Sequence, residues 1–165
     1  DHCLSRGLGD VYKRQDLPKV VSVQNAYNLL NRIYESGMSE FHHRSQVGLL
    51  AYSPLAQGYL TGKYLDGARP AGARTTLFER GQRYETEQAE EIIRKYVNLA
   101  NEYSMDPALM ANSFVNDQDF VTSNIIGATT MEQLKIAVGS IDTKLDEECL
   151  KKIEEIHYGC PNPCP

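Results

Sequence analysis

Two short segments carry the residues best suited to hold a phosphate-bearing ligand. The first, AYSPLAQG, occupies residues 51–58, and the second, GATTMEQ, occupies residues 127–133. Each follows an apolar run, and small residues let backbone N–H groups approach a phosphate. A helix beginning near Met131 would add the positive end of its dipole. Taken singly, each segment is better explained as an ordinary turn and helix cap. Neither segment alone therefore predicts a ligand site; the hypothesis depends on the two occurring together.

The other catalytic and metal-binding patterns that we sought do not occur. No GxGxxG follows an apolar run, and GxSxG, HExxH and P-loop patterns are absent from the sequence. Cys160 and Cys164 with His157 lack a fourth zinc ligand nearby, so we predict no metal site. The four cysteines lie mostly near the chain ends, which favours reduced thiols over a disulfide framework.

Charge and hydropathy narrow the class of partner. The formal net charge of -5 argues against a general binder of nucleic acid, whose affinity comes largely from basic side chains. The sequence contains no run of about 18 apolar residues, the length needed to span a bilayer. We therefore expect a cytoplasmic protein with neither a nucleic-acid nor a membrane partner. By contrast, residues 56–83 carry five basic and two acidic side chains, a local balance of +3. This long segment is predicted to be an irregular loop that closes over an anion.

Alternating elements must position these segments. Buried strands are predicted at residues 20–24, 47–52 and 121–126. Helices are predicted at residues 33–44, 86–103, from Asp106 through Val115, from Thr130 through Val138, and from Asp146 through Ile156. Strands that alternate with helices and read as continuous apolar runs are typical of a parallel sheet covered on both faces. This α/β pattern fits either a small open domain or part of a barrel.

Three ranges divide the chain. Residues 1–15 show neither helical nor strand periodicity, and we interpret them as a non-native or disordered leader. Residues 16–158 form the patterned domain, and residues 159–165 form a tail.

Three motifs resemble a known family in their order and spacing. QNAYNL (residues 24–29), AYSPLAQGYLTGKY (51–64) and IIGATTMEQL (125–134) resemble the last three strands of aldo-keto reductases. The resemblance extends from about residue 16 to the tail, and it favours the branch containing Tas-like reductases and potassium-channel β-subunits. It implies the C-terminal part of a (β/α)8 TIM barrel, an incomplete barrel of about three strands with their helices.

The resemblance also implies a site for NADP(H). Gln24 would hydrogen-bond the nicotinamide carboxamide, and Tyr52 would stack on the nicotinamide ring. The pyrophosphate would be lined by Ser53, Pro54, Leu55, Ala56 and Gln57, with the basic residues Lys63 and Arg74 closing over the coenzyme. Gly127, Thr129 and Gln133 would surround the adenosine 2'-phosphate, which favours NADP over NAD.

Two departures from the family pattern limit this inference. Where the family often has Glu and Asn to hold the adenine, this chain has Ile136 and Ala137. The family's catalytic Asp, Tyr, Lys and His come from its first four strands, and no counterpart occurs here. We therefore assign no catalytic residue in this chain, and none of Tyr27, Tyr52 and Lys63 takes such a role.

Three functions remain open at this stage. The first is NADPH-dependent reduction of a small aldehyde or ketone by a parent enzyme that supplies the catalytic half. The second is a regulatory subunit that binds NADPH without significant catalysis. The third is an inactive half-barrel, whose unpaired sheet edges would cause self-association.

Overall fold

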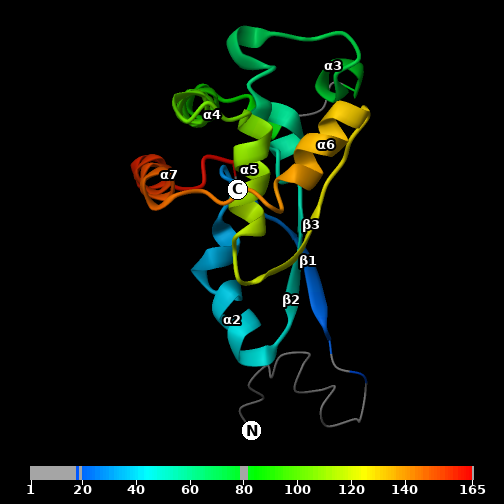
Figure 1. Cartoon of the computed structure of the whole chain (residues 1–165), viewed down its shortest axis with the longest axis vertical. Coiled ribbons are helices and arrows are strands. Elements are labelled where there is room, and N and C mark those ends of the chain that lie inside the picture. The colour runs from blue at the N-terminus through cyan, green and yellow to red at the C-terminus, as the bar shows by residue number, and fades with distance from the viewer. Residues whose placement is uncertain (1–17, 19, 79–81, 165) are drawn as a thin grey trace, which may run out of the picture.

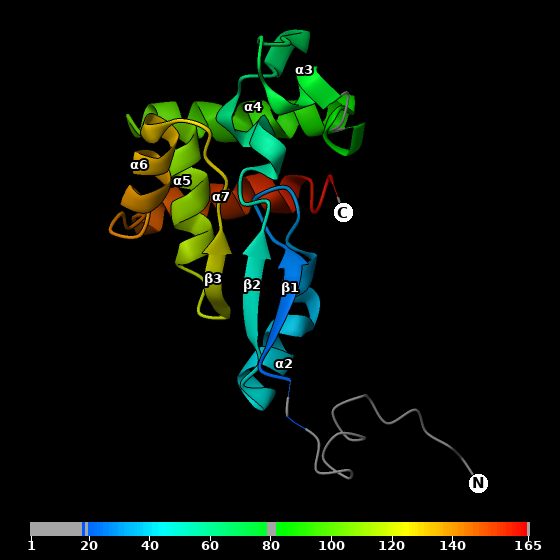
Figure 2. The ribbon, with the colours of Figure 1, turned by 90° about the vertical axis from the view of Figure 1, so that its right-hand side faces the viewer.

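The computed structural model contains three parallel strands with most of the helices gathered on one side of them (Figures 1 and 2). The structure describes residue 18, residues 20–78 and residues 82–164, so the leader 1–15 lies outside the described residues. The strands are β1 (Ser22–Ala26), β2 (Gly48–Tyr52) and β3 (Val121–Ile125), in the spatial order β1-β2-β3. The helices are α2 (Met38–Ser45), α3 (Arg74–Phe78), α4 (Glu87–Glu102), α5 (Pro107–Asn116), α6 (Met131–Gly139) and α7 (Glu147–Gly159).

Both strand pairs are parallel, as the alternation of strands and helices predicts. β1 and β2 pair without interruption from Ser22 opposite Gly48 to Ala26 opposite Tyr52. The β2–β3 register shifts between residues 49 and 50. A Cβ on Gly48 would lie 1.9 Å from Thr122 Oγ1, so this close approach of β2 and β3 requires glycine.

The two faces of the sheet differ in burial. Leu49 and Ala51 of β2 face the helices and are fully buried. On the opposite face Tyr52 and Ile125, which pair with each other, are 38% and 39% exposed. The prediction that the strands are buried on both faces is therefore wrong, because no described helix covers this second face. A sheet packed on one side only is what a part of a (β/α)8 barrel presents.

Three of the predicted helix starts are confirmed by their caps. Thr86, Asp106 and Asp146 each accept a hydrogen bond from a backbone N–H in the first turn of α4, α5 and α7, respectively. α4 packs an apolar stripe into the core. The core includes Tyr27, Leu49, Ala51, Ile92, Tyr96, Phe114 and Ile153.

Other predicted elements are corrected. The single helix predicted at 33–44 is a 3-10 turn, Ile33–Ser36, followed by α2 after a break at Gly37. Met38 and Phe41, expected on its apolar side, are 40% and 44% exposed. α6 also buries none of its side chains.

The long loop at 56–83 contains more structure than its glycines suggested. It includes α3 and three 3-10 segments, Ala56–Thr61, Leu65–Gly67 and Gln82–Tyr84. β1 begins two residues later than predicted.

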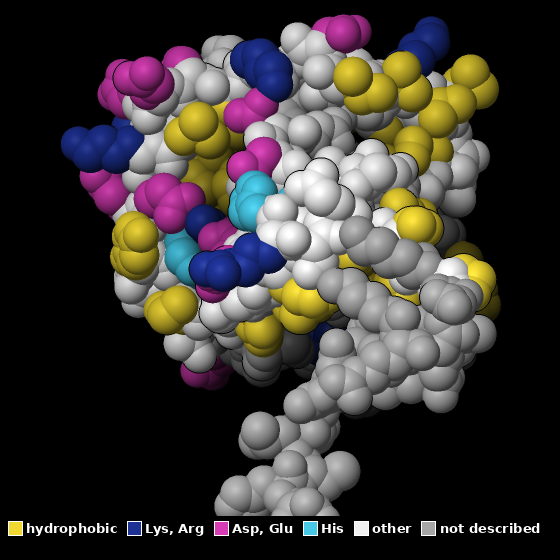
Figure 3. All heavy atoms as spheres, turned by 90° about the horizontal axis from the view of Figure 1, so that it is seen from below, with side chains coloured by type: hydrophobic (Ala, Val, Ile, Leu, Met, Phe, Trp, Pro, Cys, Tyr) yellow, Lys and Arg dark blue, Asp and Glu magenta, His cyan; other side chains and the backbone are white. Residues whose placement is uncertain are grey.

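Figure 3 views the end of the molecule near α2, where basic and acidic side chains of the described residues lie among one another. Within the ranges described above, no helix is both long and apolar enough to cross a membrane.

Candidate functional site

The carboxyl ends of the three strands bring the predicted site residues to one end of the sheet. Gln24 is exposed in β1 and pairs with Leu50, while Tyr52 ends β2 opposite Ile125 of β3. Because side chains alternate along a strand, Gln24 and Tyr52 share the face that no described helix covers. Three loops continue from these ends, and we call them the β1 loop (residues 27–31), the β2 loop (53–58) and the β3 loop (126–130).

The β2 loop is a tight coil with an unusual backbone. Ser53, Ala56 and Gln57 have φ values of 57°, 48° and 59°, in the left-handed region that non-glycine residues seldom adopt. Backbone hydrogen bonds close the coil, from Ala56 N to Ser53 O at 2.9 Å and from Gly58 N to Leu55 O at 2.8 Å. Each such residue costs about 1–3 kcal/mol, and strain of this kind concentrates at ligand sites.

Part of the coil is packed into the protein. Pro54 and Ala56 are buried, whereas Ser53, Leu55 and Gln57 are partly accessible. The structure therefore places the predicted pyrophosphate-binding residues in one hydrogen-bonded turn, of which Ser53, Leu55 and Gln57 remain partly accessible.

Lys63 lies against this turn. A Cβ on Gly58 would approach the Lys63 Cε and Nζ atoms to 3.0 Å, so the glycine leaves room for the lysine side chain. Lys63 Nζ also lies 5.1 Å from the centroid of the Tyr64 ring. Lys63 forms no ion pair with another described residue, so its charge is available to a ligand.

Arg74 occupies a separate position. It begins α3 and is exposed. Figure 2 shows α3 and α6 on opposite sides above the strand ends, so the basic segment and the β3 loop approach the site from different directions. A ligand that contacted both would have to extend across the ends of the strands.

The β3 loop is exposed and is held by local hydrogen bonds. Thr130 Oγ1 accepts from Gln133 N at 3.2 Å, which confirms the predicted helix cap. The Gln133 side chain turns to Thr129, accepting from its N at 2.9 Å and from its Oγ1 at 3.1 Å. Gly127 lies exposed in the same loop. Gln133 thus orders the loop at the N-terminus of α6, where the helix dipole favours an anion.

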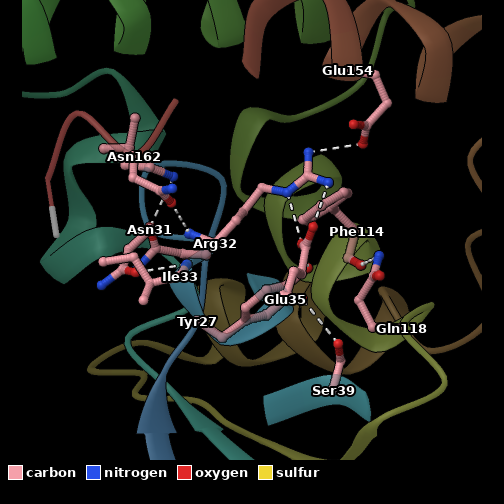
Figure 4. A network of polar contacts seen from close by, with 12 residues as sticks. Tyr27, Asn31, Arg32, Ile33, Glu35, Ser39, Phe114, Gln118, Glu154 and Asn162 are labelled. Carbon is pink, nitrogen blue, oxygen red and sulfur yellow. Dashed lines mark hydrogen bonds and ion pairs between the residues drawn. The ribbon is translucent and has the colours of Figure 1, made fainter. Parts of the chain in front are cut away.

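A network of charged groups behind the β1 loop was not foreseen (Figure 4). The Arg32 guanidinium is 8% exposed, donates to Glu35 at 2.7 and 2.8 Å, and pairs with Glu154 at 2.8 Å. The Tyr27 hydroxyl donates to the same Glu35 carboxylate. Burial and the Glu35 charge raise the pKa of Tyr27 well above its usual value. The Tyr27 hydroxyl is therefore held in its protonated form by the same carboxylate that accepts its hydrogen bond.

Asn28 is a second residue whose role the sequence did not indicate. It is fully buried in the β1 loop, and its Nδ2 donates to Ser53 O of the β2 loop at 2.9 Å. The available signal was an asparagine between apolar residues, which buries a polar amide only when it finds hydrogen-bond partners.

Two observations limit the chemistry of the site. Across the described residues, no group of three or more His, Cys, Asp and Glu side chains is arranged to hold a metal ion. Two hollows at the surface lie apart from the strand ends, one along α4 and α7 near Leu99 and Ile156, and one beside Tyr59 and Tyr84. The predicted site is thus an open surface with a rigid turn, one lysine beside it and a helix N-terminus, an arrangement that fits an extended phosphate-bearing ligand.

Comparisons with known proteins identify relatives of this sequence. A sequence model of the Aldo/keto reductase family matches residues 7–157. Protein tas of Escherichia coli (strain K12) is 49% identical over 152 residues, which cover 92% of this chain and 44% of that protein. The match to the family begins inside residues 1–15, and the domain boundary at residue 16 stays a prediction.

Two further relatives are named for different functions, one as a reductase and one as a channel subunit. L-glyceraldehyde 3-phosphate reductase of Escherichia coli (strain K12) is 36% identical over 72% of this chain and 36% of that protein. A putative voltage-gated potassium channel subunit beta of Schizosaccharomyces pombe is 32% identical over 82% of this chain and 42% of that protein. The chain therefore spans less than half the length of these curated relatives.

Proposed function

The chain belongs to the aldo/keto reductase family, and we propose that it carries the coenzyme-binding part of an NADPH-dependent reductase of aldehydes or ketones. The observation that carries the proposal is the convergence of Gln24, the β2 loop and the β3 loop at one end of the sheet. The catalytic residues would come from sequence outside these 165 residues.

Each part of the site has a distinct task in this proposal. Gln24 offers an exposed amide to the nicotinamide carboxamide, and the half-exposed Tyr52 ring offers a flat surface to the nicotinamide. The coenzyme would supply the hydride. The protein's contribution is to bind and orient it, so that one face of the ring meets the carbonyl carbon of the substrate.

The charged end of the coenzyme would extend from the β2 loop to the β3 loop. Lys63 and Arg74 would neutralise phosphate charge, because neither is engaged in an ion pair with a described residue. Thr129 and Gln133 at the N-terminus of α6 would receive the adenosine 2'-phosphate. A site for this phosphate is the reason to propose NADP(H) in preference to NAD(H).

A titration tests the coenzyme first. We expect the protein to enhance and shift NADPH fluorescence with saturation, and to bind NADH more weakly. In protein that includes the catalytic residues, NADPH should be consumed with members of a panel of small aldehydes and ketones. Failure to bind either coenzyme would overturn the coenzyme proposal. Binding of NADPH without turnover of any panel member would support coenzyme binding and refute the proposed carbonyl reduction.

A regulatory role is the second candidate, and the similarity to a potassium channel subunit beta favours it. In this role the coenzyme would alter the affinity for a partner protein without significant turnover. A partner complex whose affinity is the same with NADPH and with NADP+ would rule out this candidate.

The open sheet also supports a proposal about assembly. β1 and β3 are the edges of the three-stranded sheet, and Tyr52 and Ile125 lie exposed on its uncovered face. Unpaired strands of this kind pair readily with other chains. We expect the isolated 165-residue chain to self-associate, and a monodisperse monomer in light scattering would contradict this.

A further inference from the structure

The β1 and β2 loops are joined by one buried side chain. Asn28 has no exposed surface, and its Nδ2 donates to the carbonyl oxygen of Ser53 at 2.9 Å. Its Oδ1 accepts from Leu30 N at 2.9 Å within its own loop. One amide group therefore uses its donor on the β2 loop and its acceptor on the β1 loop.

The group that Asn28 holds is the first residue of the strained coil. Ser53 has a φ of 57°, and its carbonyl oxygen also accepts from Ala56 N at 2.9 Å. Tyr52 directly precedes it, and Tyr52 O accepts from Tyr27 N at 3.2 Å. The direction in which the chain leaves β2 is thus set by hydrogen bonds from two consecutive residues, 27 and 28.

The β1 loop is itself fixed from behind, so it can act as a rigid support. Asn28 and Asn31 exchange backbone hydrogen bonds at 3.1 and 3.0 Å. Arg32 N donates to Asn162 Oδ1 at 2.6 Å, and Arg32 also belongs to the charged network of Figure 4. The support therefore runs from the C-terminal tail through the β1 loop to Ser53.

We propose that Asn28 is a positioning residue for the nicotinamide end of the coenzyme site. It holds Ser53 in the left-handed conformation and thereby sets the place of Tyr52 and of the backbone of the β2 loop. Its burial prevents it from touching the ligand. The inference rests on the proposed coenzyme function and adds a residue to it.

An asparagine is required because both ends of its side chain are used. A leucine of similar volume offers neither a donor to Ser53 nor an acceptor to Leu30. An ionised aspartate would place an oxygen against the Ser53 carbonyl oxygen, but a protonated aspartic acid could donate to it again. The two replacements therefore give different predictions.

The chain offers a matched control in Asn112. This asparagine of α5 is also buried, at 1% exposed, and its Nδ2 donates to Ala108 O of its own helix at 2.9 Å. Its Oδ1 accepts from Asn124 Nδ2 of β3 at 3.1 Å, and Asn124 Nδ2 keeps a second acceptor in Asn116 Oδ1 when Asn112 is replaced. Asn112→Leu and Asn28→Leu each remove one buried amide, and both should reduce the free energy of unfolding. Only the second removes a bond to the β2 loop.

The experiment compares binding of the two halves of the coenzyme. For Asn28→Leu we expect about tenfold weaker binding of NADPH and of reduced nicotinamide mononucleotide, the effect of losing one buried hydrogen bond. Binding of 2',5'-ADP, which carries the phosphate assigned to the β3 loop, should be unchanged. Asn112→Leu should leave all three affinities unchanged. Amide hydrogen exchange at Ala56 should accelerate in Asn28→Leu only.

The Asn28→Asp variant gives a second readout that does not depend on tolerating leucine. Its affinity for NADP+, relative to that of the unaltered protein, should rise as the pH falls from 8 to 5.5, because protonation restores the donor. An equal loss for both halves of the coenzyme, or unchanged Ala56 exchange, would overturn the positioning role. If the unaltered protein bound no coenzyme, the proposed function would fail, and hydrogen exchange would still decide whether Asn28 orders the coil.

Discussion

The β1 and β3 loops leave the same end of one sheet but are held in opposite ways. All residues of the β1 loop, 27–31, are buried, whereas all residues of the β3 loop, 126–130, are exposed. The β1 loop bonds to distant parts of the chain, to Ser53 and through Leu30 O to Cys164 N. The side-chain bonds of the β3 loop stay within four residues.

The difference follows from what each loop must bury. The β1 loop contains Tyr27, Leu29 and Leu30, whose apolar surface is removed from water together with the polar groups between them. The β3 loop is composed of Ile126, glycine, alanine and two threonines and has little to contribute to a core. The loop assigned to the proposed nicotinamide end is therefore fixed by the core, whereas the loop assigned to the proposed 2'-phosphate end is held only by local bonds.

Removing Arg32 should have the largest effect on this contrast. Arg32→Met leaves the carboxylates of Glu35 and Glu154 without their shared cation behind the β1 loop. Loss of one partner of a buried ion pair costs about 3–5 kcal/mol, and because both carboxylates are partly exposed we expect about 2–3 kcal/mol in the free energy of unfolding. Urea denaturation measures it.

Arg94→Met is the matched control for the Arg32 substitution. Arg94 pairs with Asp66 and Glu90 at the surface, and such exposed pairs contribute little to stability because solvent screens them. Equal losses for Arg32→Met and Arg94→Met would mean that apolar packing alone holds the β1 loop.

The next largest effect is expected for the basic residues Lys63 and Arg74, whose removal should weaken coenzyme binding. Lys63→Ala should weaken NADPH binding by about 1.5–3 kcal/mol, the range for hydrogen bonds to charged groups, and NADH binding by less. Arg74→Ala should act in the same direction. Lys95→Ala is the control, since Lys95 pairs with Glu91 within α4 and lines the hollow between α4 and α7. Identical losses for NADPH and NADH would move both side chains away from the 2'-phosphate.

The sequence predicted most of the regular elements because their signals are local. Asp106, Thr130 and Asp146 cap their helices as expected, and β2 lies within one residue of its predicted bounds. A cap depends on a side chain and a backbone N–H two or three residues apart, so one sequence contains all the information.

The features that the sequence did not predict depend on contacts between residues far apart along the chain. Burial of Met38 and Phe41, and of the second face of the sheet, depends on whether another element covers them, which no local pattern reports. Asn28 and the Arg32 network escaped notice because their partners, Ser53 and Glu154, lie 25 and 122 residues away along the chain. The β2 loop could be recognised by its motif, but its left-handed backbone at three non-glycine residues could not.

A smaller effect is expected at the β3 loop. Gln133→Ala removes the acceptor of Thr129 N and Thr129 Oγ1, both exposed. Because water replaces these bonds, the free energy of unfolding should fall by less than about 1 kcal/mol. Amide hydrogen exchange at Thr129 should nevertheless accelerate. A loss of stability as large as that of Arg32→Met would show that the β3 loop is also part of the core, and the contrast between the loops would disappear.

The smallest effect is expected in the pH dependence of stability, through His157 near the β1 loop. His157 of α7 lies near Arg32, and its Nδ1 is buried without a hydrogen-bond partner among the described residues. Burial, and then the Arg32 charge, lower the pKa of His157 below its usual 6.5. As the pH falls through 6.5 the unfolded chain binds this proton before the folded protein does, so stability is lost in that direction.

Urea midpoints between pH 7.5 and 5.5 should therefore fall less in His157→Gln than in the unaltered protein. Gln133→Ala should leave the slope unchanged, because the side-chain bonds at the β3 loop involve only threonine and glutamine; equal slopes in all three proteins would exclude His157 as the source.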